Sequence, residues 1–172
     1  MKTAIVIGYG NDLRSDDAIG QLIANTIKSW DLPNLTSLAV HQLTPELAEP
    51  LANTDLAIFV DACINSQFKE VQVQSLLPSE LNTINTHISN PRSLLALSQM
   101  LYGHSLPAWL VTVPGVNFEL GDRGLLIWVL IVFNSDGNND CTCTSLNWEL
   151  IQASTKIAKS VFAKGSANSG VN

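Results

Sequence analysis

The chain has 172 residues, of which 46% are hydrophobic and 14% are charged, and its formal net charge is −6. This length is typical of one domain with a substantial core, and the apolar composition excludes a disordered or polyelectrolyte chain. Nine Lys and Arg residues stand against fifteen Asp and Glu residues. This balance argues against a partner that is a nucleic acid or an anionic membrane surface, because both require a basic surface.

Cysteine usage and hydropathy predict a cytoplasmic protein without a membrane span. The three cysteines are an odd number and form no evident disulfide framework. The apolar run 3–7 near the N-terminus ends at Gly8, which is too early for a signal peptide. The longest apolar run, residues 125–133, has nine residues. A membrane-spanning helix needs about 20.

Along the chain, short apolar runs alternate with stretches of helical periodicity. Strands are predicted where apolar and β-branched residues follow one another, and helices where apolar residues recur every three or four positions. In chain order, these elements are a strand at 3–7, a helix at 19–30 with Ser15, Asp16 and Asp17 as N-cap candidates, a strand at 35–40, a helix at 45–52 with Pro45 in its first turn, strands at 56–60 and 71–76, a helix at 92–102 capped by the segment Ser89-Asn90-Pro91, a strand at 109–113 and a helix at 146–162. This alternation predicts an α/β three-layer sandwich, with a mostly parallel twisted sheet and helices on both faces.

Acidic and imidazole side chains follow the predicted strands. Asp16 and Asp17 come after the first strand, Asp61 comes directly after the third, and His87 lies in the loop before the third helix. Functional groups gather at the carboxyl ends of parallel strands, so we expect these segments to converge. Two carboxylates and an imidazole would form a three-ligand site with open positions, suited to nickel, zinc or a cadmium surrogate. The same residues also fit structural roles, namely a helix N-cap for Asp17, an Asx turn for Asp61 and a surface loop position for His87.

A longer pattern surrounds the first acidic pair. The segment IGYGNDLRSDDAIG, from Ile7 to Gly20, resembles the opening signature of the hydrogenase maturation endopeptidases, G-x-G-N-x-L-x-x-D-[DE]-x-x-G. Further similar segments follow in the same order, namely HQLTPELA from His41, VDA from Val60, TH at Thr86 and His87, LYG from Leu101, VPG from Val113 and FELG from Phe118. The resemblance covers about residues 3–123, and QLTPEL and LYG are most similar to the branch that processes bidirectional, NAD-linked hydrogenases.

The resemblance implies a substrate and a set of site residues. Members of this family remove a C-terminal extension from the precursor of the nickel-iron hydrogenase large subunit after nickel has been inserted. Transferred to this sequence, the family's nickel-binding residues are Asp17, Asp61 and His87. The implied activity is that of an aspartyl-type endopeptidase whose nickel belongs to the substrate and serves as the recognition signal, with no permanent cofactor. We expect a monomer whose partner is the large-subunit precursor.

Three other interpretations compete with this one. A dinucleotide-binding protein is disfavoured, because Leu13 occupies the position where the fingerprint G-x-G-x-x-G requires glycine. A nucleophilic hydrolase built on Cys63 and one of the histidines lacks any surrounding signature, so we expect Cys63 to pack in the core. The third interpretation is a binding module that recognises a metallated partner without cutting it.

The resemblance is interrupted near the C-terminus. Residues 124–144 interpose an apolar stretch and a turn-rich stretch where the family usually has a short polar connection to its last helix. We expect a single peptidase domain over residues 1–164 that contains this atypical insertion. The last residues, 165–172, are expected to form a disordered tail.

Overall fold

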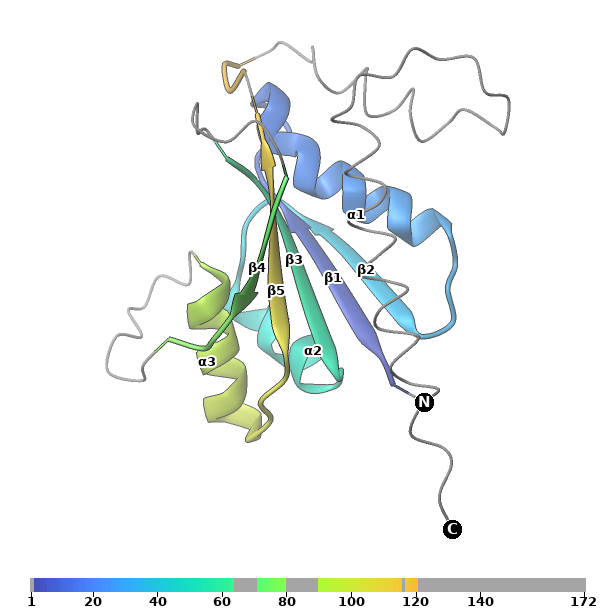
Figure 1. Ribbon diagram of the computed structural model, residues 1–172, viewed down its shortest axis with the longest axis vertical. Coiled ribbons are helices and arrows are strands. Elements are labelled where there is room, and N and C mark those ends of the chain that lie inside the picture. The colour runs from blue at the N-terminus through green and yellow to red at the C-terminus, as the bar shows by residue number, and fades with distance from the viewer. Residues whose placement is uncertain (1, 64–70, 80–89, 116, 121–172) are drawn as a thin grey trace.

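The computed structural model describes residues 2–63, 71–79, 90–115 and 117–120, which form a five-stranded sheet with helices packed against it (Figure 1). The strands are β1 (Ala4–Tyr9), β2 (Leu35–Val40), β3 (Leu56–Cys63), β4 (Gln72–Leu76) and β5 (Ala108–Pro114). The α-helices are α1 (Ile19–Ser29), α2 (Ala48–Ala52) and α3 (Pro91–Tyr102), and 3-10 turns precede the first two, η1 (Ser15–Ala18) and η2 (Pro45–Leu47).

The sheet has the strand order β2-β1-β3-β5-β4. β1 pairs in parallel with β2 and β3, and β3 pairs in parallel with β5, whereas β4 is an antiparallel edge strand. Helix α1 covers one face, and α2 and α3 cover the other (Figure 1). The predicted three-layer α/β sandwich is confirmed.

The two faces of β1 explain why its sequence is apolar without alternation. Ile5 and Ile7 belong to the core cluster under α2 and α3, whereas Ala4 and Val6 belong to the cluster under α1. Successive side chains of a strand point to opposite faces, so a strand covered on both faces must be apolar at every position. β3 follows the same rule, with all five residues of 56–60 buried.

β3 extends further than the sequence predicts. The expected strand ends at Val60, but β3 continues to Cys63, because Asp61 and Ala62 remain paired with Thr112 and Val113 of the neighbouring β5. Asp61 therefore lies within a strand rather than directly after one. The proposed Asx turn at Asp61 is accordingly wrong, since paired extended backbone replaces the turn.

The predicted helix ends are right for α3 and wrong for α1. The side chain of Asn90 accepts a hydrogen bond from the Ser93 amide at 2.9 Å, and Gly103 ends α3 with a left-handed φ of 67°. At α1, by contrast, no side chain caps the helix, because η1 precedes it and the two aspartates of that turn accept hydrogen bonds from loop amides.

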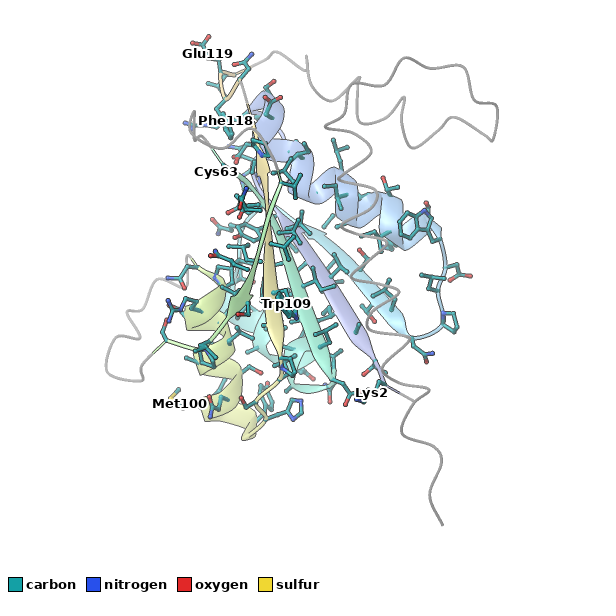
Figure 2. The ribbon with its side chains drawn as sticks, in the orientation of Figure 1. Lys2, Cys63, Met100, Trp109, Phe118 and Glu119 are labelled. Carbon is teal, nitrogen blue, oxygen red and sulfur yellow. The ribbon has the colours of Figure 1, made fainter. Side chains whose placement is uncertain are left out.

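The last turn of α3 is exposed, although its apolar residues continue the helical periodicity that predicts a buried face. Met100 and Leu101 are 56% and 57% exposed, because the buried positions of this helix end at Ser98 (Figure 2 labels Met100). The predicted helix 146–162, the segment 124–144 and the tail 165–172 lie outside the described residues. Within the described ranges, no helix is long and apolar enough to cross a membrane.

Helix α1 packs against the sheet at two glycines, Gly20 of the helix itself and Gly8 of β1. A Cβ on Gly20 would lie 2.6 Å from the backbone oxygen of Val60 in β3 and would also collide with the backbone oxygen of Tyr9 in β1. A Cβ on Gly8 would collide with the backbone oxygen of Gly20 itself. The first turn of α1 can therefore approach β1 and β3 only because these positions lack side chains.

This close packing yields a stability prediction. We expect Gly20→Ala to lower the free energy of unfolding by about 3 kcal/mol or more in urea titrations, because backbone atoms rather than flexible side chains must move apart. Gly103→Ala is the control, since its Cβ would meet nothing within 4 Å and only the positive φ is strained. That strain costs about 1 kcal/mol. A smaller loss for Gly20→Ala than for Gly103→Ala would contradict the prediction.

Candidate functional site

The carboxyl ends of β1 and β3 form the centre of the candidate site. The connection from β1 to β2 passes through α1 on one face, and the connection from β2 to β3 passes through α2 on the other. Open α/β sheets bind ligands at such a switch point, outside the carboxyl ends of the strands. Figure 1 shows these ends near the start of α1 and the 117–120 segment, at the end of the sheet opposite the N-terminus.

Asp61 lies on β3 beside Tyr9 of β1. Its carboxylate accepts hydrogen bonds from the Tyr9 hydroxyl and from the Ala62 backbone amide. Burial raises the pKa of Asp61 above its ordinary value, and the negative charge of Asp17 raises it further, whereas the two hydrogen bonds act in the opposite direction. Burial and the Asp61 charge likewise raise the pKa of the Tyr9 phenol, so Tyr9 remains a hydrogen-bond donor.

Asp17 is held by the loop that follows β1. Its Oδ2 accepts a hydrogen bond from the Asn11 amide at 2.9 Å, and its own amide donates to the Arg14 carbonyl at 2.8 Å. Gly10 makes this loop possible, because its φ is 144° and a Cβ there would collide with the Asp17 carbonyl oxygen. The Asn11 side chain closes the turn by accepting from the Leu13 amide at 2.9 Å. The carboxylate of Asp17 is thus fixed to the end of β1.

Asp16 has a different role from its neighbour. It is 1% exposed, and its Oδ2 accepts a hydrogen bond from the Asn117 amide at 2.8 Å. Its own amide donates to the Asn117 carbonyl at 3.0 Å, so two hydrogen bonds connect η1 to the segment after β5. Asp16 therefore stabilises the loops around the site, and Asp17 is the member of the acidic pair whose charge acts on Asp61.

The structure brings together two of the three predicted site residues. Asp17 and Asp61 lie near the carboxyl ends of β1 and β3, where the Asp17 charge raises the pKa of Asp61, whereas His87 lies outside the described residues. Within residues 2–63, 71–79, 90–115 and 117–120, no group of three or more His, Cys, Asp or Glu side chains could hold a metal ion. The described part of the site thus supplies two carboxylates, and the three-ligand set remains a prediction.

Sequence reasoning missed two contributors to this site, Tyr9 and Asn117. Tyr9 occupies a variable position of the signature, so the resemblance assigns it no role. The signal that identifies it is its position relative to Asp61, since Gly8 pairs with Val60 and the next residue of each strand faces the same side. Asn117 has no such signal, because it is 101 residues away from Asp16 along the chain.

Cys63 does not occupy the predicted core position. It is half-buried at the end of β3, belongs to neither core cluster, and lies in the same region as Phe118 and Glu119 (Figure 2). His41 Nδ1 lies 3.8 Å from an Asp12 carboxylate oxygen, and His104 Nε2 lies 2.9 Å from the Thr54 carbonyl. Neither of these contacts involves Cys63, and they give the nucleophile interpretation no support.

The loop after β1 also disfavours a dinucleotide. A phosphate at this position would need free backbone amides, but the Asn11 amide already donates to Asp17. Two aspartates in η1 would add like charge beside the phosphate.

Solved structures of hydrogenase maturation proteases share this fold. A [NiFe] hydrogenase maturation protease HycI from Thermococcus kodakarensis superposes with a TM-score of 0.54 and 21% identity, over 71% of this chain and 80% of its own. The hydrogenase maturating endopeptidase HybD from E. coli superposes with a TM-score of 0.52 and 21% identity, over 69% of this chain and 77% of its own. An endopeptidase from Escherichia coli superposes with a TM-score of 0.51 and 23% identity, over 73% of this chain and 84% of its own.

The sequence comparisons add nothing to this likeness. No protein-family model matches the chain, and no curated protein matches it significantly. The structural likeness therefore establishes the fold, and the chemistry must be argued from the site residues themselves.

The raised pKa of Asp61 predicts a pH-dependent stability difference in the metal-free protein. The folded state holds the Asp61 proton more tightly than the unfolded state does. The free energy of unfolding therefore falls as the pH rises from the Asp61 pKa of the unfolded chain to the higher Asp61 pKa of the folded chain. Asp61→Asn removes this loss while keeping an acceptor for Tyr9. We expect it to raise the free energy of unfolding near neutral pH by ~1 kcal/mol, with the difference vanishing in acid.

The measurement is urea unfolding of both proteins over a pH series. Asp31→Asn is the matched control, because Asp31 is exposed beyond the end of α1 and its φ of 47° is one that asparagine tolerates. An Asp61→Asn variant that is less stable than the native chain at neutral pH would contradict the prediction.

Proposed function

We propose that this chain is an endopeptidase that removes the C-terminal extension of a nickel-iron hydrogenase large-subunit precursor after nickel insertion. The observation that carries the proposal is the position of two carboxylates at the switch point, with Asp17 in the loop after β1 and Asp61 on β3, close enough that the Asp17 charge raises the pKa of Asp61. This pair lies on a fold that is shared with hydrogenase maturation proteases. The resemblance of the 7–20 signature supports the same assignment.

The two carboxylates retain the capacity to bind a metal. The Asn11 amide occupies one acceptor position on Asp17, and the Tyr9 hydroxyl and Ala62 amide occupy two on Asp61. A carboxylate offers about four lone-pair positions, so each group can still contact a cation. We propose that His87, as a neutral imidazole, is the third ligand.

Such a ligand set suits recognition of nickel that the substrate already holds. Thiolates are stronger donors to nickel than carboxylates, so two aspartates can contact a thiolate-bound ion without extracting it. The nickel is therefore substrate, and it serves as the recognition signal. An ion held at this position would also polarise a nearby scissile carbonyl or lower the pKa of an attacking water.

The remaining parts of the proposal concern the biological setting. A net charge of −6 with few basic residues supports a function without a nucleic-acid partner. The QLTPEL and LYG segments support a substrate from the bidirectional, NAD-linked hydrogenases. We propose that the protein acts in the cytoplasm as a monomer.

The decisive experiment mixes the protein with nickel-loaded and nickel-free precursor and measures the precursor mass. We expect the C-terminal extension to be lost from the nickel-loaded form alone. Stable binding of the nickel-loaded form without any shortening would instead favour the non-proteolytic binding module. Equal cleavage of both forms would refute nickel recognition.

The site assignment predicts the effect of single substitutions. Asp17→Asn, Asp61→Asn and His87→Ala should each slow cleavage of the nickel-loaded precursor about 100-fold or more, because each removes a group that contacts the reacting centre. Asp31→Asn should cleave at the native rate, since Asp31 is distant from the site. Cleavage at the full rate by Asp61→Asn would refute the assignment of Asp61.

A further inference from the structure

Tyr9 has a position that the catalytic assignment does not use. Ile7 pairs with Phe59 and Gly8 with Val60, so Tyr9 and Asp61 are the next residues of two adjacent parallel strands. Neighbouring strands are about 4.8 Å apart, and residues at this spacing share a face of the sheet. Tyr9 and Asp61 therefore lie side by side on the face that α2 and α3 cover.

The Tyr9 side chain packs against the core, and its backbone is held within the sheet. The side chain is half-buried against the core cluster that includes Ile7 and Phe59, and the backbone pairs in register with Val40 of β2. Apolar packing restricts the ring, so its hydroxyl is fixed at the position where it donates to Asp61. A phenylalanine would fill the same space, so packing alone does not account for the hydroxyl.

β5, the described strand on the other side of β3, does not supply a second hydrogen bond of this kind to Asp61. Thr112 of β5 pairs in register with Asp61. Among the side chains that the structure describes, however, the hydrogen bond to the Asp61 carboxylate comes from Tyr9. Within the described part of the chain, the orientation of the Asp61 carboxylate thus depends on the Tyr9 hydroxyl and on the Ala62 amide of its own strand.

We propose that Tyr9 is a positioning residue, whose hydroxyl fixes the Asp61 carboxylate so that its free lone pairs face the metal of the substrate. The proposal rests on the proposed function of the site. Carboxylates that bind metals are themselves held by hydrogen bonds, and loss of such a partner typically weakens metal binding about 10- to 100-fold. Because the Asn11 amide holds Asp17 in the same way, residues 9–11 orient both carboxylates.

Tyr9→Phe tests the proposal, with Ni²⁺ alone as the probe in titration calorimetry and nickel-loaded precursor in cleavage assays. We expect Ni²⁺ affinity to fall about tenfold. We also expect kcat for the precursor to fall by a similar factor with little change in KM, because the reacting group is misplaced while the binding surface is intact. Tyr102→Phe is the matched control, since it makes the same change on an exposed residue of α3.

A double-mutant cycle separates positioning from a merely structural role. If Tyr9 acts through Asp61, Tyr9→Phe should cause no further loss of Ni²⁺ affinity in an Asp61→Ala background, where the Tyr9 hydroxyl has no acceptor at this position. A full tenfold loss in that background would overturn the proposal. Unfolding midpoints of all variants show whether each one is folded, so that a loss of affinity is not mistaken for unfolding.

The two levels of the proposal fail in different ways. If the native chain neither binds Ni²⁺ nor cleaves the nickel-loaded precursor, the proposed function fails and the role of Tyr9 fails with it. If the native chain does both and Tyr9→Phe matches it in affinity and kcat, only the role of Tyr9 is overturned. The control variant Tyr102→Phe should match the native chain in every assay.

Discussion

The parallel pairing of β1 with β3 is the constraint on which the rest of the structure depends. It places Tyr9 beside Asp61, and it fixes the strand ends from which the Asp17 loop departs. It also requires α1 to approach both strands closely, which only glycine at position 20 permits. The same strand pairing therefore determines how closely α1 packs on the sheet and where the two site aspartates lie.

The two carboxylates at the carboxyl ends of β1 and β3 lower the stability of the fold, but they supply groups that can bind a metal or transfer a proton. Burial and mutual repulsion disfavour the ionised form of Asp61, and a domain selected for stability alone would place an apolar or neutral side chain there. The surrounding hydrogen bonds from the Tyr9 hydroxyl and the Asn11 amide reduce this cost without removing it. Such local conflict within an otherwise consistent sheet is typical of a functional site.

The fold alone leaves the activity open, since α/β sheets of this kind serve many reactions. What narrows the choice is the chemistry at the switch point. In the turn after β1, the Asn11 amide donates to the Asp17 carboxylate and is not free to bind a phosphate. Neither of the described histidine contacts involves Cys63. Asp17 and Asp61 remain as the candidate functional groups of the described structure, on a fold that solved hydrogenase maturation proteases share.

The sequence by itself determined the order of the described strands and helices, the burial of both sheet faces and the candidates Asp17 and Asp61, because apolar periodicity and the 7–20 signature are local properties. It misjudged the end of β3 and the capping of α1, since both depend on partners elsewhere, namely β5 and Asn117. Only the tertiary structure decided that Asp16 connects loops while the charge of Asp17 acts on Asp61, and that Tyr9 is the hydrogen-bond partner of Asp61. Strand order creates these contacts, and a single chain read residue by residue does not reveal which strands become neighbours.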